Sequence, residues 1–460
     1  MTEQITTRNP ATGAELATYG VHDETGIETR LAAAHAAYGE WSQRTVEERT
    51  GLLRDVGKLL TERREEYAAL VTAEMGKPLK EALAEIDKCA WNCTVVADAA
   101  PGWLADREME SAAQRSWVSS EPLGLVFAVM PWNYPFWQVL RFACAALVAG
   151  NGAVLKHSPN VTGSALAIEQ LFADAGAPAG LFVTLVLAEA SLADTMPRVI
   201  GDPRVAAVTL TGSERAGEAV GALAGRFLKK SVLELGGSDP FVVLDDADLV
   251  AAADAAVKSR FGNGGQSCIA AKRFIVADAV ADDFVALLVE RVGLLQVGDP
   301  TAPGTTVGPM ARADLRDGLH RQVEASIAEG AVLVTGGEPI EPTYYAPTVL
   351  DHVRPGMTSF DQETFGPVAS VVRARDDDHA VELANDTEYG LGAAVWSRSE
   401  RGLAVGRRIR SGALFVNAMV ASDPRLPFGG IGRSGYGREL AGEGTREFTN
   451  QRTVFVGGAS

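Results

Sequence analysis

Apolar and polar residues follow one another with two different periods along this chain. From about residue 25 to 104, apolar residues recur at helical spacing among Glu, Arg and Lys, which predicts a series of amphipathic helices. Around residues 115–118 the pattern changes to alternation, and residues 124–130 form a continuous apolar run that Pro131 ends. Such a run is typical of a buried strand.

Beyond residue 131, short apolar runs alternate with segments of helical periodicity. The strands that these runs predict lie at 154–155, 182–186, 205–210 and 232–234, and then at 241–244 and 273–276. The predicted helices that separate them lie at 161–173, 213–224 and 249–260. Alternation of this kind indicates an α/β protein with parallel sheets covered by helices on both faces, in which ligands bind at the carboxyl ends of the strands.

Composition narrows the class of protein. The chain has 460 residues, of which 47% are hydrophobic, so it is long enough for two or three domains with large cores. Its net charge of −17 argues against nucleic acid or an anionic membrane as partner, because both attract clusters of Lys and Arg. The N-terminal residues lack the features of a signal peptide, and no apolar stretch is long enough to span a bilayer. We therefore expect a soluble cytoplasmic protein.

The four cysteines, Cys89, Cys93, Cys144 and Cys268, are too few for a disulfide framework in a chain of this length. Cys89 and Cys93 have the i, i+4 spacing of two metal ligands on one helix face, but no pair of histidines accompanies them, so we expect no metal site. Cys144 lies in an apolar run typical of a core, whereas Cys268 has polar and glycine-rich neighbours.

Two side chains with catalytic chemistry each stand beside a pair of glycines. Glu234 precedes Leu235-Gly236-Gly237, Cys268 follows Gly264-Gly265-Gln266-Ser267, and a strand-like run comes after each. Because paired glycines allow the backbone to approach closely, we predict that the two loops converge on one reaction centre. There Cys268 is a candidate nucleophile and Glu234 a candidate general base. The alternatives are a buried inert cysteine and a glutamate on a solvated turn.

Other segments suit an oxyanion hole and a coenzyme. Asn133 lies between two prolines and among aromatic residues, so its amide is a candidate oxyanion donor, and an aromatic core turn is the alternative. Thr211-Gly212-Ser213 joins a strand to a helix, where backbone N–H groups either bind a phosphate or simply cap the helix. Lys156, at a strand end, is a candidate ligand for ribose or phosphate, with an ordinary surface lysine as the alternative.

Taken together, these segments resemble the aldehyde dehydrogenase superfamily over the full chain. The matching segments are Pro131-Trp132-Asn133-Tyr134-Pro135, Leu155-Lys156, Thr211-Gly212-Ser213, Glu234-Leu235-Gly236-Gly237, Gly265-Gln266-Ser267-Cys268, Glu363-Thr364-Phe365-Gly366-Pro367-Val368 and Pro427-Phe428-Gly429-Gly430. The resemblance implies a Rossmann-type coenzyme-binding domain (1–104 and 125–235), a second α/β catalytic domain (236–437) and a small β oligomerisation arm (105–124 and 438–460). It also implies a homodimer or homotetramer, since such an arm pairs sheet edges across subunits.

By this resemblance Cys268 forms the acyl-enzyme, Asn133 and the Cys268 backbone N–H bind the oxyanion, and Glu234 activates the water that releases the acid. The residues implied to bind the nicotinamide coenzyme are Trp132, Lys156, Ser158, Pro159, Gly212, Ser213, Leu235, Glu363 and Phe365. Members that favour NAD usually carry a Glu three residues beyond the lysine, and here that position is Pro159. Since no carboxylate then repels a 2′-phosphate, we expect NADP to be favoured, with NAD still usable.

The resemblance also bears on the substrate. In this family the helix after Asn133 lines the substrate tunnel, and here it carries Gln138 and Arg141. A buried guanidinium without a partner is costly, so Arg141 favours an aldehyde with a carboxylate, and an ion pair within the protein is the alternative. The chain is similar here to bacterial succinate-semialdehyde dehydrogenases. This implies succinate semialdehyde as substrate, bound by Arg141, Gln138, Ser422 and Phe428, although glutarate semialdehyde fits nearly the same charges.

Two other functions stay open from the sequence. A coenzyme-A-acylating relative would use the same cysteine, but such enzymes generally lack a base at the position of Glu234. A non-catalytic scaffold is the second, and the presence of both Cys268 and Glu234 argues against it. Some relatives also carry a second cysteine near the nucleophile as a redox switch, and residues 269–271 contain none.

Overall fold

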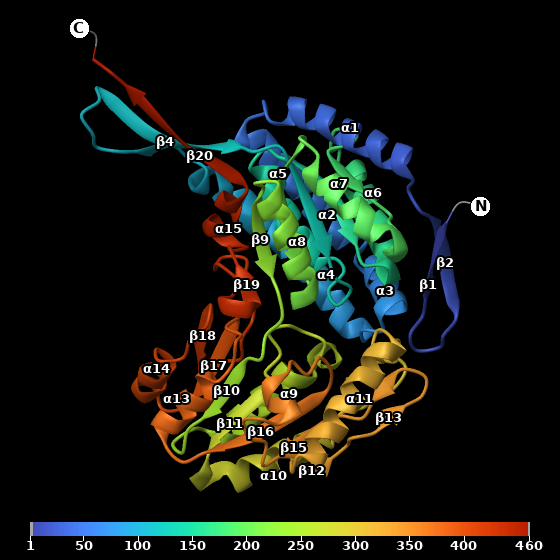
Figure 1. Ribbon diagram of the computed structural model, residues 1–460, viewed down its shortest axis with the longest axis vertical. Coiled ribbons are helices and arrows are strands. Elements are labelled where there is room, and N and C mark those ends of the chain that lie inside the picture. The colour runs from blue at the N-terminus through green and yellow to red at the C-terminus, as the bar shows by residue number, and fades with distance from the viewer. Residues whose placement is uncertain (1–2, 459–460) are drawn as a thin grey trace.

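The computed structural model describes residues 3–458, which form two sheet-centred bodies and a projecting arm (Figure 1). The sheet of the first body has six strands in the order β19-β9-β8-β5-β6-β7. Its strands are β5 (Leu125–Met130), β6 (Gly152–His157), β7 (Phe182–Thr184), β8 (Val205–Thr211), β9 (Lys230–Glu234) and β19 (Gly435–Tyr436). These strands pair in parallel except β19, which is antiparallel to β9.

Alternate residues of the central strand β5 enter two different cores. Val126 and Ala128 pack on one face, and Leu125 and Phe127 pack on the other. The first face is covered by α2 (Val46–Glu62), α3 (Arg64–Met75), α4 (Leu79–Trp103), α5 (Trp137–Val148) and α6 (Thr162–Asp174), and the second by α1 (Glu24–Trp41), α7 (Leu192–Gly201) and α8 (Glu214–Arg226). Since strand side chains point alternately to two faces, burial on both sides explains the continuous apolar run of β5.

The second body is built on a seven-stranded sheet of order β12-β15-β16-β11-β10-β17-β18. Its strands are β10 (Pro240–Val243), β11 (Arg273–Ala277), β12 (Val332–Thr335), β15 (Thr348–Asp351), β16 (Val368–Ala374), β17 (Gly392–Trp396) and β18 (Ala413–Val416). One face is covered by α9 (Leu249–Phe261) and α10 (Ala281–Val292), and the other by α11 (Ala313–Ala328), α13 (Asp377–Asn385) and α14 (Ser399–Gly406). Both bodies therefore have the three-layer α/β architecture that the alternating pattern predicts.

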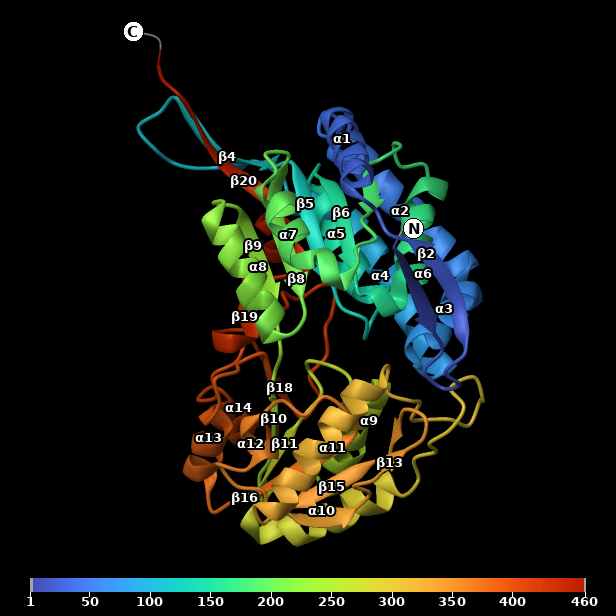
Figure 2. The same cartoon turned by 45° about the vertical axis from the view of Figure 1, so that its right-hand side comes forward.

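A third sheet projects from the first body as an arm (Figures 1 and 2). It consists of β3 (Arg107–Glu108), β4 (Arg115–Pro122) and β20 (Thr449–Val456), and β4 pairs antiparallel with the other two. Near the end of the arm, Phe455 is 60% exposed and Val456 is 42% exposed. The arm thus presents apolar side chains to solvent beside the open edges of a narrow sheet.

The predicted strands and helices agree with the structure to within a few residues, and the predicted α/β fold class is confirmed. The strand predicted at 182–186 is shorter, because the Val186 carbonyl accepts a hydrogen bond from the His22 N–H instead of continuing the ladder. The division into domains stays a prediction. Among the helices of residues 3–458, none combines the length and the apolar character that a membrane span requires.

Candidate active site

The predicted catalytic residues lie where the first sheet meets loops of the second body. Asn133 follows β5, Glu234 ends β9, and Cys268 follows α9 and the short 3-10 turn η3 (Gly262–Gly265). A cavity of about 300 Å³ has Cys268 and Arg141 on its wall, together with Gln138, Ser422 and Phe428. The structure therefore gathers the candidate nucleophile and all four predicted substrate residues around one space, while Asn133 and Glu234 are buried outside its wall.

The glycines beside Glu234 and Cys268 are required by close contacts. A Cβ on Gly237 would lie 2.8 Å from the Cys268 carbonyl oxygen, so the loop after Glu234 passes directly against the loop of the nucleophile. A Cβ on Gly265, where φ is +72°, would lie 2.2 Å from the carbonyl oxygen of Gly366. Neither position accommodates a side chain. The two loops converge, as the paired glycines predicted.

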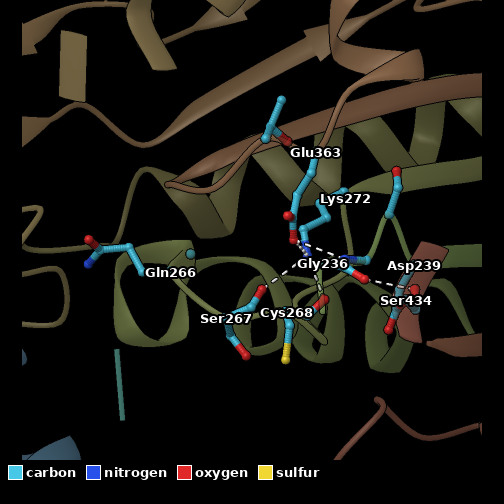
Figure 3. Close-up of polar contacts among 12 residues, drawn as sticks. Gly236, Asp239, Gln266, Ser267, Cys268, Lys272, Glu363 and Ser434 are labelled. Atoms are coloured by element: carbon cyan, nitrogen blue, oxygen red, sulfur yellow. Dashed lines mark hydrogen bonds and ion pairs between the residues drawn. The ribbon is translucent and has the colours of Figure 1, made fainter. Parts of the chain in front are cut away.

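The thiol of Cys268 is half-buried, and burial raises its pKa to about 12, while the positive charges of Lys272 and Arg141 act in the opposite direction. Lys272 Nζ donates hydrogen bonds to the carbonyl oxygens of Ser267 (3.0 Å) and Cys268 (2.6 Å). Figure 3 shows the sulfur pointing away from the side chains of Lys272 and Glu363. With this pKa the thiol holds its proton at neutral pH, so it must lose that proton before it attacks.

Asn133 is held in one orientation by hydrogen bonds. Its Nδ2 donates to the Gln266 carbonyl oxygen (2.9 Å), and its Oδ1 accepts from Gln138 Nε2 (3.0 Å). Asn263 Nδ2 donates to the Asn133 carbonyl oxygen (3.0 Å), which fixes the loop as well. An amide nitrogen has two N–H groups, so Asn133 Nδ2 keeps one that its bond to Gln266 does not use. Gln138, predicted to contact substrate, thus lines the cavity and also orients Asn133.

Glu234 is buried, and within residues 3–458 neither of its carboxylate oxygens has a hydrogen-bond partner. Burial raises its pKa well above the usual range, and the negative charge of Glu439 adds to the shift, while Arg141 and Arg438 oppose it. The carboxyl group therefore keeps its proton at a pH where a solvated glutamate is ionised. This excludes the alternative of a solvated turn and gives a proton-binding group at the site.

Arg141 forms a buried ion pair with Glu439 and also lines the cavity. Its Nη2 donates to Thr211 Oγ1 (3.2 Å), and its guanidinium carbon lies 4.8 Å from the centre of the Phe428 ring. The ion pair that the sequence left as an alternative is therefore present. Glu439 reaches this place because the backbones of residues 428 and 439 exchange two hydrogen bonds, although the sequence prediction grouped residues 438–460 with the arm.

At another part of the wall, Ser422 Oγ accepts a hydrogen bond of 2.7 Å from Lys88 Nζ. Lys88 comes from α4, and its ammonium group lies 4.4 Å from the centre of the Trp137 ring. Neither Lys88 nor Glu439 was identified from the sequence. Lys88 lies among the charged residues of an amphipathic helix, where a lysine usually faces solvent, and Glu439 belongs to no motif that indicates its role.

Three of the predicted coenzyme residues, Glu363, Trp132 and Phe365, make defined contacts in the structure. Glu363 Oε1 accepts a hydrogen bond from the Gly237 N–H (3.1 Å) and lies 3.2 Å from Lys272 Nζ, as Figure 3 shows. Trp132 and Phe365 meet edge to face, with ring centres 5.8 Å apart. A carboxylate and two aromatic rings of this kind suit the nicotinamide riboside end of a coenzyme, because they offer acceptors for hydroxyl groups and apolar contact for a ring.

The other predicted coenzyme residues lie at or just after the carboxyl ends of β6, β8 and β9 in one sheet, which suits an extended dinucleotide. Lys156 is buried in β6, and within residues 3–458 no carboxylate oxygen lies within 4 Å of its Nζ. Such an ammonium group fits ribose hydroxyls or a phosphate. Ser213 caps α8 by accepting from the Ala216 N–H (3.4 Å). The remaining members of the set are Ser158 and Pro159 after β6, Gly212 after β8 and Leu235 after β9.

Comparison with known proteins gives concordant matches. The model of the aldehyde dehydrogenase family matches residues 1–454. The NAD(P)+ succinate semialdehyde dehydrogenase Sad of Escherichia coli (strain K12) is 46% identical over 97% of this chain and 96% of its own length. A probable NADP(+) succinate-semialdehyde dehydrogenase of Synechocystis sp. is 45% identical over 98% of this chain and 99% of its own. The solved structure of succinic semialdehyde dehydrogenase from Streptococcus pyogenes in complex with NADP+ superimposes with a TM-score of 0.96 at 36% identity, and covers 99% of this chain and 100% of that one.

Proposed function

Because the chain belongs to the aldehyde dehydrogenase family, we propose that it oxidises succinate semialdehyde to succinate with NADP or NAD as coenzyme. The observation that carries the proposal is the cavity that has Cys268 on one part of its wall and Arg141 and Ser422 on another. A thiol suits attack on an aldehyde, and cationic and hydroxyl groups suit a carboxylate at the other end of the same small molecule.

In the first step, the Cys268 thiol gives its proton to water, and the thiolate attacks the aldehyde carbon to form a tetrahedral thiohemiacetal whose oxygen carries the negative charge. We assign stabilisation of its oxygen to the free N–H of the Asn133 amide and to the backbone N–H of Cys268. Gln138 and the Gln266 carbonyl hold that amide in place before the reaction. Fixed donors of this kind stabilise the charge of the transition state without a cost of reorganisation at the moment of reaction. The bound nicotinamide coenzyme supplies the acceptor for the hydride that then leaves the carbon.

In the second step, a thioester on Cys268 is hydrolysed. We assign the removal of a proton from the attacking water to Glu234, whose carboxylate oxygens make no other hydrogen bond in the described part of the chain. A raised pKa suits a general base that works near neutral pH, because it binds the proton more strongly than a solvated glutamate does. The presence of this base favours hydrolysis over transfer of the acyl group to coenzyme A.

We assign the adenosine end of the coenzyme to Lys156, Ser158 and Pro159. The proline adds no negative charge next to the Lys156 ammonium, which favours a 2′-phosphate and hence NADP. We further propose a homodimer or homotetramer in the cytoplasm, in which β20 of the arm buries its exposed apolar side chains against another subunit.

A steady-state panel tests this function. Succinate semialdehyde, glutarate semialdehyde and neutral aldehydes of equal chain length are each supplied with NADP+ and with NAD+, and the acid product is measured with and without coenzyme A. We expect the highest kcat/KM for succinate semialdehyde with NADP+, and free succinate as product without coenzyme A. A strict need for coenzyme A would favour an acylating enzyme. No coenzyme reduction with any aldehyde would favour a scaffold.

A further inference from the structure

The cations on the cavity wall differ in how their charge is balanced. The guanidinium of Arg141 already pairs with the buried carboxylate of Glu439, so this pair carries little net charge. Lys88 has no such partner: within residues 3–458, no carboxylate oxygen lies within 4 Å of its Nζ. Its ammonium group instead contacts the hydroxyl of Ser422 through a hydrogen bond and the face of the Trp137 ring through a cation–π contact. Among the described residues of this wall, Lys88 is therefore a half-buried cation that no carboxylate balances, whereas the charge of Lys258 is exposed to solvent.

The acidic groups nearest to Lys88 are bound elsewhere. Asp423 uses both carboxylate oxygens for Arg425, at 2.9 Å from Nε and 2.6 Å from Nη2. Glu85 pairs with Lys77 and also accepts hydrogen bonds from the backbone N–H groups of residues 136 and 137. None of these carboxylates is free to move to Lys88 without leaving another cation or N–H group unpaired.

We propose that Lys88 binds the carboxylate of the substrate, together with Ser422, and that this contact sets the preference for anionic aldehydes. The proposal rests on the proposed function and adds the residue that supplies the net charge. Because the Ser422 oxygen accepts from Lys88, its hydroxyl hydrogen is free to donate to a carboxylate oxygen, and the ammonium group has two further hydrogens to donate.

The surroundings of Lys88 affect both its mobility and its charge. The ring of Trp137 holds the ammonium group by a cation–π contact, so less side-chain entropy is lost when a ligand binds. Burial and the positive charge of Arg141 lower the pKa of Lys88 to about 8, whereas the charges of Cys89, Asp423 and Glu85 raise it. An anion bound in the cavity would also raise the pKa of Lys88 and so stabilise its protonated form.

The test compares kcat/KM for succinate semialdehyde and for butanal, which has four carbons and a neutral end. In Lys88→Met, which keeps much of the side-chain volume but removes the charge, we expect a loss of at least about 30-fold for succinate semialdehyde and less than about threefold for butanal. Lys88→Gln should show the same selective loss, and Lys88→Arg should restore most of the preference. Lys258, an exposed lysine on the same wall, gives the matched control. Lys258→Met should change kcat/KM for each of the two substrates by less than about threefold, because solvent screens the charge of Lys258.

Equal losses for both substrates in Lys88→Met and Lys88→Gln would overturn the proposal, and so would a preference that both variants retain. Butanal turnover in the variants reports whether the catalytic residues are still intact. Failure of the proposed function looks different, because the wild-type enzyme itself would then show no preference for succinate semialdehyde over butanal.

Discussion

The ammonium group of Lys272 lies 3.2 Å from the Glu363 carboxylate, directly behind the backbone of the candidate nucleophile (Figure 3). The two charges act in opposite directions on the Cys268 thiol, because Lys272 lowers its pKa and Glu363 raises it. Lys272 is fully buried, whereas Glu363 is partly exposed. Any ligand that draws the carboxylate away from Lys272 would therefore leave the lysine to favour the thiolate.

Neutral substitutions of Glu363 and of Lys272 should change the reactivity of Cys268 in opposite directions. In Glu363→Gln the pKa of the thiol should fall, and alkylation by iodoacetamide at pH 8 without coenzyme should become roughly three- to tenfold faster. In Lys272→Gln the pKa should rise and alkylation should slow by a similar factor. The other three cysteines are buried, so Cys268 dominates the reaction. A change of the same sign in both variants would show that structural disturbance, not charge, controls the thiol.

Loss of the Asn133 amide should slow the chemical step strongly. Removal of one oxyanion donor costs roughly 3–4 kcal/mol, so we expect kcat of Asn133→Ala to fall by hundreds-fold or more, with much less change in KM. Pre-steady-state formation of the reduced coenzyme measures this step. A variant with turnover like that of the wild type would remove Asn133 from the oxyanion hole.

Gln138 should act on the same step through Asn133. Its Nε2 donates to Asn133 Oδ1, so Gln138→Leu leaves the amide present but less firmly oriented. We expect kcat to fall by about tenfold, with similar factors for anionic and neutral aldehydes. If only the anionic substrate is affected, then Gln138 contacts the substrate carboxylate and does not position the amide.

Glu234→Gln should separate acylation from hydrolysis. Without the base, the thioester should accumulate, so a burst of about one reduced coenzyme per active site should precede slow turnover. In the wild type, deacylation should speed up with rising pH as Glu234 loses its proton, because its pKa is raised. The glutamine variant should lose that pH dependence. Linear progress curves without a burst would contradict the assignment.

The same substitution should stabilise the protein. The raised pKa means that, above the ordinary pKa of glutamate, the folded state binds more protons than the unfolded state, so stability falls as pH rises toward the folded-state pKa. Glu234→Gln removes this loss of stability, and we expect the free energy of unfolding at pH 8 to increase by roughly 1 kcal/mol or more. Thermal unfolding at pH 5 and pH 8 measures the effect, which should be larger at pH 8.

The choice between NADP+ and NAD+ should depend on residue 159, which begins the turn after β6. In Pro159→Glu a carboxylate would stand near Lys156, so kcat/KM for NADP+ should fall by at least about tenfold, while that for NAD+ changes by less than about threefold. Pro159→Gln is the matched neutral control and should affect both coenzymes alike. Equal effects of the glutamate and the glutamine would mean that charge at this position does not select the coenzyme.

The sequence predicted what depends on local pattern. Strands such as β5 follow from continuous apolar runs, and the convergence of the Glu234 and Cys268 loops follows from paired glycines. It did not predict which charges meet. Lys88 and Ser422 are 334 positions apart, and their hydrogen bond depends on how α4 packs against a loop of the second body. Periodicity shows that a lysine lies on a helix, but it does not show what the fold places opposite it.

The ion pair of Arg141 and Glu439 also has a consequence for protein synthesis. Its glutamate comes long after its arginine in the chain, so the guanidinium is synthesised well before its partner. Before Glu439 is made, the thiol of Cys268 already exists, but the guanidinium that lines the same cavity has no counter-ion and β9 lacks its antiparallel neighbour β19. A chain that stops before Glu439 therefore carries Cys268 while the charge of Arg141 in the same cavity stays unpaired.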